Sequence, residues 1–245
     1  MVTDAGGKRR GAAGLLGLFG GKWPKWRLLA LEVFNVTFML SFWALAQHFF
    51  PGRYTPLENH ISDQGGLAAN PTGHWFFNAS VVVTGVLVLP AFAFLYHRLA
   101  VTCSWTSRLF LVSTVVGSAA FSGLGVFPQD VEVPHDWCAD LAFGGLGFGA
   151  FLMMLVVLRS KLPPRAGGPW PNWLVLPYGF LVVAAALAAT VPNAPPGVRS
   201  AWTGDPRVFD DPPWQWTSFF AVLAWLICSL LAAPGEKQTR EDRRT

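Results

Sequence analysis

The stretch WFFNASVVVTGVLVLPAFAFLY, from Trp75 to Tyr96, decides the fold class of this 245-residue chain. It carries no charged side chain, and it is as long as the roughly 20 residues that an α-helix needs to cross a hydrocarbon core of about 30 Å. Five comparable blocks accompany it: Trp26–Phe50, Arg108–Phe127, Trp137–Leu158, Trp173–Val191 and Trp214–Ala233. The sequence therefore predicts an all-α, polytopic integral membrane bundle of six transmembrane helices.

Composition agrees with a membrane protein. Hydrophobic residues make up 52% of the chain and charged residues 13%, whereas a soluble domain carries about 25% charged residues. Six spans and their connections use most of the length. We expect one transmembrane domain, 26–233, between a basic tail, 1–25, and a polar tail, 234–245. The net charge of +4 comes from span ends and tails, so we expect no nucleic-acid partner.

The basic residues are distributed unevenly between the two sides of the predicted membrane. Fifteen of the eighteen Lys and Arg residues fall in the N-terminal segment, the second and fourth connections and the C-terminal tail. The other three are Arg53, Arg199 and Arg207. Because cytoplasmic segments are rich in Lys and Arg, this pattern predicts a multi-pass protein of the cell membrane with both termini in the cytoplasm. Most Asp, Glu and His residues fall on the opposite, outer face.

Two polar segments on that outer face are the candidates for chemistry. The first runs from Tyr54 to Gly66 and contains His60, Ser62 and Asp63, and the second contains Asp130 and His135. Both lie at the same predicted depth, so we expect Asp63, Asp130 and His135 to converge. A carboxylate beside an imidazole can transfer protons. The alternative is structural, because Ser and Asp also cap short helices.

Several residues inside the predicted spans add to this candidate site. Asp140 lies at the hydrocarbon edge, where an ionisable side chain normally faces the bundle interior or water, so we expect a catalytic role or a structural ion pair. Trp43, Phe121 and Trp225 are expected to line an apolar cavity, with His60 and Ser62 at its mouth. Glu32 is expected to reach the membrane surface or to pair with Arg27.

A metal site is an alternative to metal-free chemistry. His60 and His135, with Asp63 or Asp130, are residue types that bind zinc. The sequence has no HExxH motif and no paired-histidine spacing, so we expect no cofactor and keep zinc as the alternative.

Two features predict how the helices pack. Gly145 and Gly149 form a GxxxG pair, which lets helix backbones approach closely, and we expect it to serve packing inside the bundle. Pro90 lies within the second span and predicts a local kink.

The two polar segments carry a resemblance to a known family. The run PLENHISDQG, Pro56–Gly65, followed by Asn70 and Pro71, resembles the first motif of the domain-of-unknown-function 998 membrane proteins. The run GVFPQD, Gly125–Asp130, followed by His135, resembles their second motif. The FRAG/DRAM/Sfk membrane group is similar. The resemblance covers about residues 30–233, with Gln64 in place of an apolar residue and a longer fifth connection.

The resemblance implies functional positions at Ser62, Asp63, Gly65, Asp130 and His135, and its relatives' links to lipid remodelling imply a lipid-like ligand. The resulting hypothesis is a membrane enzyme that acts on a lipid or isoprenoid by acid–base chemistry, for example an isoprenoid cyclase. A non-catalytic lipid-binding or regulatory protein and a metal-dependent lipid hydrolase are the alternatives. The expected partners are the bilayer and a lipid or isoprenoid, and the oligomeric state stays open.

Overall fold

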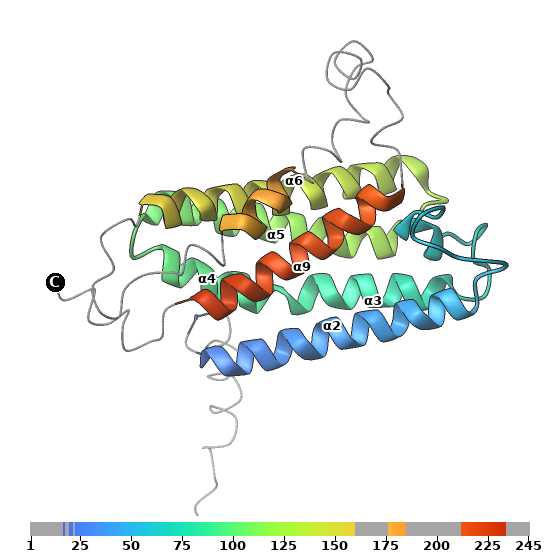
Figure 1. Ribbon diagram of the computed structural model, residues 1–245, viewed down its shortest axis with the longest axis horizontal. Coiled ribbons are helices and arrows are strands. Elements are labelled where there is room, and N and C mark those ends of the chain that lie inside the picture. The colour runs from blue at the N-terminus through green and yellow to red at the C-terminus, as the bar shows by residue number, and fades with distance from the viewer. Residues whose placement is uncertain (1–16, 18–19, 22, 160–175, 185–211, 234–245) are drawn as a thin grey trace, which may run out of the picture.

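A computed structural model describes residues 17, 20–21, 23–159, 176–184 and 212–233 of the chain (Figure 1). All regular structure in these residues is helical. The elements are α2 (Lys25–His48), the 3-10 helix η1 (Ile61–Gln64), α3 (His74–Leu87), α4 (Leu89–Leu99), α5 (Ser104–Val126), α6 (Glu132–Arg159) and α9 (Pro212–Ala232). Residues 176–184 are also helical.

Five helical segments of the described chain are long and apolar enough to cross a membrane. They are Lys25–His48, His74–Leu99, Ser104–Val126, Glu132–Arg159 and Gln215–Ala232. Each matches one of the predicted spans to within a few residues. The protein is therefore a polytopic helical membrane protein. Of the remaining predicted span, Trp173–Val191, only residues 176–184 are described, and most of the tails, 1–25 and 234–245, lies outside the described residues.

The largest difference from prediction is the start of α6. The sequence predicts a loop up to Asp136, but the helix begins at Glu132, and the amide of His135 donates to the carbonyl of Val131 at 3.1 Å. An acidic residue in the first helical turn is favourable because it faces the positive end of the helix dipole. His135 is therefore held by a helix rather than by a loop.

The two ends of the bundle differ in character (Figure 1). Lys25 Nζ, at the start of α2, donates to the carbonyls of Leu231 and Ala233 at 3.0 and 3.1 Å. The start of α2 and the end of α9 therefore lie at one end, which we call the basic end. The opposite end, where the connections 49–73 and 127–131 gather, is called the loop end.

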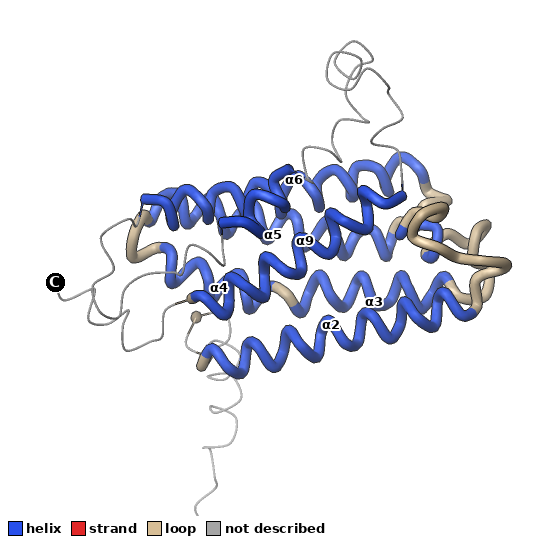
Figure 2. The backbone as a smooth tube through the Cα atoms, in the orientation of Figure 1, coloured by secondary structure: helices blue, strands red, loops and turns tan. Residues whose placement is uncertain are grey.

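The second span is broken near its middle. α3 ends at Leu87 and α4 begins at Leu89, and Figure 2 shows the short non-helical break between them. Pro90 has no amide hydrogen to donate to the preceding turn, and its ring crowds that turn. The kink predicted at Pro90 is confirmed, and it lies beside the cavity described below.

Small residues bring α5 and α6 into close contact. A Cβ atom on Gly145 would lie 2.8 Å from Cα of Gly117 and 2.9 Å from the carbonyl oxygen of Ser113. The Ser113 hydroxyl donates to the Gly145 carbonyl at 2.6 Å. A Cβ on Gly149 would lie 2.5 Å from Thr114 Cγ2. The GxxxG pair therefore serves packing inside the bundle, as predicted.

The helices enclose two apolar clusters. One lies towards the basic end around Leu28, Phe92 and Trp225, and the other towards the loop end around Trp43 and Phe219. Glu32 and Asn35 occupy α2 between Leu28 and Met39, and each is at most 2% exposed. The expectation that Glu32 reaches the surface is wrong, because its side chain is buried. Its Oε2 instead accepts a hydrogen bond from Asn35 Nδ2 at 3.3 Å.

The glycine contact gives a test with a matched control. Gly145→Ala places a methyl group against the α5 backbone and should lower the free energy of unfolding by about 1–3 kcal/mol. Gly144→Ala is the control, since a Cβ at Gly144 has no heavy atom within 4 Å. Thermal unfolding in detergent compares the two variants. An equal midpoint for both would contradict the packing role of Gly145.

Candidate functional site

The connection between α2 and α3 is organised by buried polar side chains. Asn70 is fully buried, and its Nδ2 donates to the carbonyls of Ala46 and Gln64 at 2.9 and 3.1 Å. Its Oδ1 accepts from the amide of Gly73 at 3.0 Å. Asn78 Nδ2, on α3, donates to the carbonyl of Gly65 at 3.0 Å. These bonds fix the segment that carries η1 over the end of the bundle.

Tyr54 and Gln64 form the centre of the same segment. The Tyr54 hydroxyl donates to the carbonyl of His60 at 2.8 Å and accepts from Gln64 Nε2 at 3.0 Å. Burial raises the pKa of Tyr54 above its ordinary value, so the hydroxyl keeps its proton and its donor role. Gln64, the residue that departs from the family motif, is fully buried and holds this tyrosine.

Asp63 stabilises the turn in which it lies. Its Oδ2 accepts from the amide of His60 at 2.8 Å, and the Asp63 amide donates to the His60 carbonyl at 3.2 Å. Both bonds close the start of η1. This geometry matches the structural alternative for Asp63, in which a carboxylate satisfies a free amide at a helix start.

Asp130 joins the two candidate loops. Its Oδ2 accepts a short hydrogen bond from the amide of Leu67, and its Oδ1 accepts from the amide of Ala68 at 3.1 Å. The two segments that the sequence singles out therefore meet through this carboxylate. Hydrogen bonds to a charged acceptor are the stronger kind, so Asp130 positions residues 66–68 against the start of α6.

His135 lies in the first turns of α6 and faces a different partner. Its Nδ1 is 2.9 Å from the carbonyl oxygen of Phe127. Because a carbonyl can only accept, Nδ1 carries a proton in this contact, and in the tautomer with a single ring proton Nε2 is an acceptor. Among the described residues, no hydrogen bond joins Asp63, Asp130 and His135 to one another.

Ser62 and His135 share a cavity at the loop end of the bundle, which we call the loop-end cavity. It is partly open, and its empty space, open solvent included, is about 480 Å³, of which the centre of a water-sized molecule can reach about 60 Å³. Aromatic and aliphatic side chains make up most of its lining, together with the amide side chain of Gln215 on α9. The lining residues are Trp43, Ile61, Ser62, Phe77, Val81, Phe121, Leu124, His135, Ala139, Phe143, Gln215 and Phe219.

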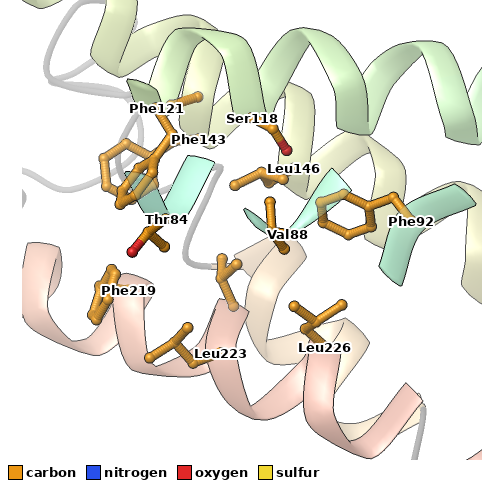
Figure 3. A pocket seen from close by; sticks show the side chains of 12 residues that line it. Thr84, Val88, Phe92, Ser118, Phe121, Phe143, Leu146, Phe219, Leu223 and Leu226 are labelled. Carbon is orange, nitrogen blue, oxygen red and sulfur yellow. The ribbon is translucent and has the colours of Figure 1, made fainter. Parts of the chain in front are cut away.

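A second cavity lies deeper, beside the break between α3 and α4, and we call it the central cavity (Figure 3). It is partly open, and its empty space, open solvent included, is about 590 Å³, of which the centre of a water-sized molecule can reach about 60 Å³. Apolar residues line it, together with two hydroxyls, those of Thr84 and Ser118. Phe121, Phe143 and Phe219 line both cavities, so the two meet at these three rings.

The remaining predicted site residues fall into two groups. Trp43 is 2% exposed and lines the loop-end cavity, with its ring 4.6 Å from that of Phe219 between centroids. Trp225 is fully buried in the core against Phe92, and Asp140 is partly buried on α6. Trp225, Asp140 and His60 are not among the described residues that line either cavity.

The metal alternative has no support in the described part of the chain, in which no group of three or more His, Cys, Asp and Glu residues is placed to hold an ion.

The residues that prediction missed are Gln215, which accepts from the amide of Ile61 at 3.2 Å, and the buried amides of Gln64 and Asn70. The sequence did contain a signal for Gln215, because it is a polar residue at the start of the predicted span Trp214–Ala233.

Comparison with known proteins identifies the family alone. A family model described as "Protein of unknown function (DUF998)" matches residues 36–232. This match confirms the resemblance carried by the two polar segments. No curated protein and no solved structure matches the chain.

The Asp130 contact can be tested by removing its charge. In Asp130→Asn one side-chain oxygen remains as an acceptor. The other is replaced by an NH₂ group, which cannot accept a hydrogen bond from the backbone N–H that it faces. The free energy of unfolding should fall by about 1–3 kcal/mol. Asp136→Asn is the matched control, because Asp136 is an exposed carboxylate six positions further along, in the first turns of α6. Equal thermal midpoints for both variants in detergent would show that Asp130 does not hold the loops together.

Proposed function

We propose that this chain, which belongs to the DUF998 family of proteins of unknown function, binds the apolar chain of a lipid or isoprenoid inside its helical bundle. The observation that carries the proposal is the pair of cavities that meet at Phe121, Phe143 and Phe219. Apolar side chains surround the central cavity, and polar groups occur at the loop end. Apolar walls with few polar groups are typical of sites for lipid-like ligands.

The proposal includes six membrane crossings. α6 ends at the basic end, whereas α9 begins at the loop end, where Gln215 contacts Ile61. The chain between them must therefore lead from one end to the other once more. The helical residues 176–184 fit this path, because Gly179 lies beside Met154 on α6 and Trp225 on α9.

We further propose that the basic end faces the cytoplasm of the cell. Five of the six described Lys and Arg residues lie at that end: Lys25, Arg27, Arg98, Arg108 and Arg159. Arg53 belongs to the connection at the loop end. The positive-inside rule then places both tails in the cytoplasm and the loop-end cavity on the outer side.

A second candidate function is acid–base chemistry on the bound lipid, with His135 as the base. The observation in its favour is the hydrogen bond from Nδ1 to Phe127, which leaves Nε2 available in a residue that lines the cavity. Asp63 and Asp130 accept hydrogen bonds from backbone amides, which favours positioning roles for both. In an isoprenoid cyclase, Trp43 and Phe121 would stabilise a cationic intermediate.

Filling the central cavity should expel the ligand. Ala142 lines this cavity and is 2% exposed, so Ala142→Trp should lower the amount of lipid that co-purifies with the protein by about tenfold. Leu141→Trp is the control, since Leu141 is 48% exposed on the outer surface of the same helix. Lipid extraction and mass spectrometry measure the effect. Unchanged lipid content in a folded Ala142→Trp protein would reject the binding site.

Cys103 offers a native probe of the topology. It lies between α4 and α5 at the basic end, and hydrogen bonding to Thr106 lowers the pKa of its thiol, which favours reaction with maleimides. With Cys138 and Cys228 changed to Ser, an impermeant maleimide should label Cys103 only in opened cells. The exposed variant Glu58→Cys should label in intact cells. The reverse pattern would place the basic end outside.

The catalytic candidate is tested by two histidines in similar settings. His135→Gln should lower conversion of the bound lipid by roughly 10²–10⁴-fold if the imidazole transfers a proton. His74→Gln is the control, because His74 also contacts backbone carbonyls at a helix start but does not line either cavity. Mass spectrometry of the lipid follows conversion. Equal turnover by both variants would leave binding as the function.

A further inference from the structure

We propose that the two cavities form one channel that selects a single-chain lipid with a terminal hydroxyl group and about 12–14 chain carbons. This proposal rests on the lipid-binding function proposed above and adds the chemical class of the ligand. Four features carry it: the length of the channel, the floor that closes it, the narrow junction between the cavities, and the polar groups at its mouth.

The length follows from two helices that run beside the channel. On α6, Leu146 lies eleven positions after His135 at the mouth, and on α9 Leu226 lies eleven positions after Gln215. At about 1.5 Å per residue, each helix gives a depth of about 16 Å. An extended chain advances roughly 1.2 Å per bond, by analogy with extended polypeptide, so this depth holds about 13 bonds.

The floor of the channel is aromatic and fully packed. Phe92 and Leu226 lie together at one end of the central cavity, away from Phe121, Phe143 and Phe219 (Figure 3). Beyond them, the Phe92 ring lies 6.1 Å from Phe110 and 6.2 Å from Trp225 between centroids. Phe110 and Trp225 are 0% exposed. A longer chain would have to displace these rings, so the channel has a fixed depth.

The junction between the cavities favours one chain over two. Phe121, Phe143 and Phe219 come from α5, α6 and α9, and any ligand that occupies both cavities passes them. Phe121 and Phe219 are stacked with their centroids 6.3 Å apart, which leaves passage only beside the rings. A lipid with two parallel chains would require these helices to separate.

The mouth offers neutral hydrogen-bonding groups to the ligand's polar end. Trp43 lines it, and its buried Nε1–H has no hydrogen-bond partner among the described residues. His135 contributes Nε2 as an acceptor, as derived from its bond to Phe127. A hydroxyl group matches both chemically, since its oxygen can accept from an indole N–H and its proton can be donated to an imidazole nitrogen. No Lys or Arg is found among the described residues that line the mouth.

The test uses linear alcohols as probes. Protein in nanodiscs is equilibrated with octanol, dodecanol or hexadecanol at equal mole fraction in the lipid, and native mass spectrometry counts the bound alcohol. At equal mole fraction in the lipid, the longer alcohols no longer gain from their more favourable transfer out of water. Differences in bound alcohol then report how well each chain fits the channel. We expect dodecanol to bind about tenfold more tightly than hexadecanol, because the longer chain overpacks the floor.

Variants separate length from headgroup recognition. Leu226→Trp should shorten the channel at its closed end and shift the binding preference to octanol. Leu231→Trp is the control and should not shift it, because Leu231 is 50% exposed. Trp43→Phe keeps an aromatic side chain, although a smaller one, and removes the donor, so the affinity for dodecanol relative to dodecane should fall about fivefold.

The outcomes that overturn the proposal differ from those that overturn the binding function. Equal binding of dodecanol and hexadecanol, with no shift in Leu226→Trp, would reject the fixed length. Equal binding of dodecanol and dodecane would reject hydroxyl recognition. Either result leaves lipid binding in place. Binding of none of the probes, together with unchanged co-purified lipid in Ala142→Trp, would reject the binding function itself.

Discussion

The carboxylate of Asp130 is the contact on which the loop end of this protein depends. It accepts from two consecutive amides, those of Leu67 and Ala68, and so joins a segment before α3 to the turn before α6. Every residue except proline supplies such an amide, so the donors do not depend on the side chains at 67 and 68, and a charged acceptor makes their bonds strong. This contact acts together with the bonds of Asn70 and Asn78 and with the Ile61–Gln215 bond, which hold η1, and with it Ser62, over the loop-end cavity.

The cavities arise because the two sides of the bundle pack differently. α5 and α6 approach closely at Gly117 and Gly145, where no side chain keeps the backbones apart. α9 instead presents large side chains, including Phe219 and Trp225, towards the other helices. Bulky rings hold a helix at a distance and leave space between them. The break before Pro90 adds to this space, because it bends the second span beside the central cavity.

Sequence reasoning predicted what depends on composition and missed what depends on particular partners. Length and hydropathy located the spans, Pro90 located the break, and the GxxxG pair located the close contact. The burial of Glu32 could not be predicted, because it depends on Asn35 one turn away. Prediction assigned His135 to a loop, since the first turn of α6 is polar and resembles a connection. The link from Asp130 to residues 67–68 spans more than sixty positions, and no local pattern encodes it.

The bond from Lys25 to the end of α9 has a consequence for biosynthesis. Lys25 enters the membrane with the first helix, whereas its acceptors at Leu231 and Ala233 are among the last residues of the bundle to be made. Until α9 is inserted, the surfaces of α2, α4 and α6 that it contacts remain open to the surrounding bilayer. A hydrophobic molecule could therefore enter sideways during synthesis and be enclosed when the first and last helices come together. Ligand loading and the completion of folding would then be a single event.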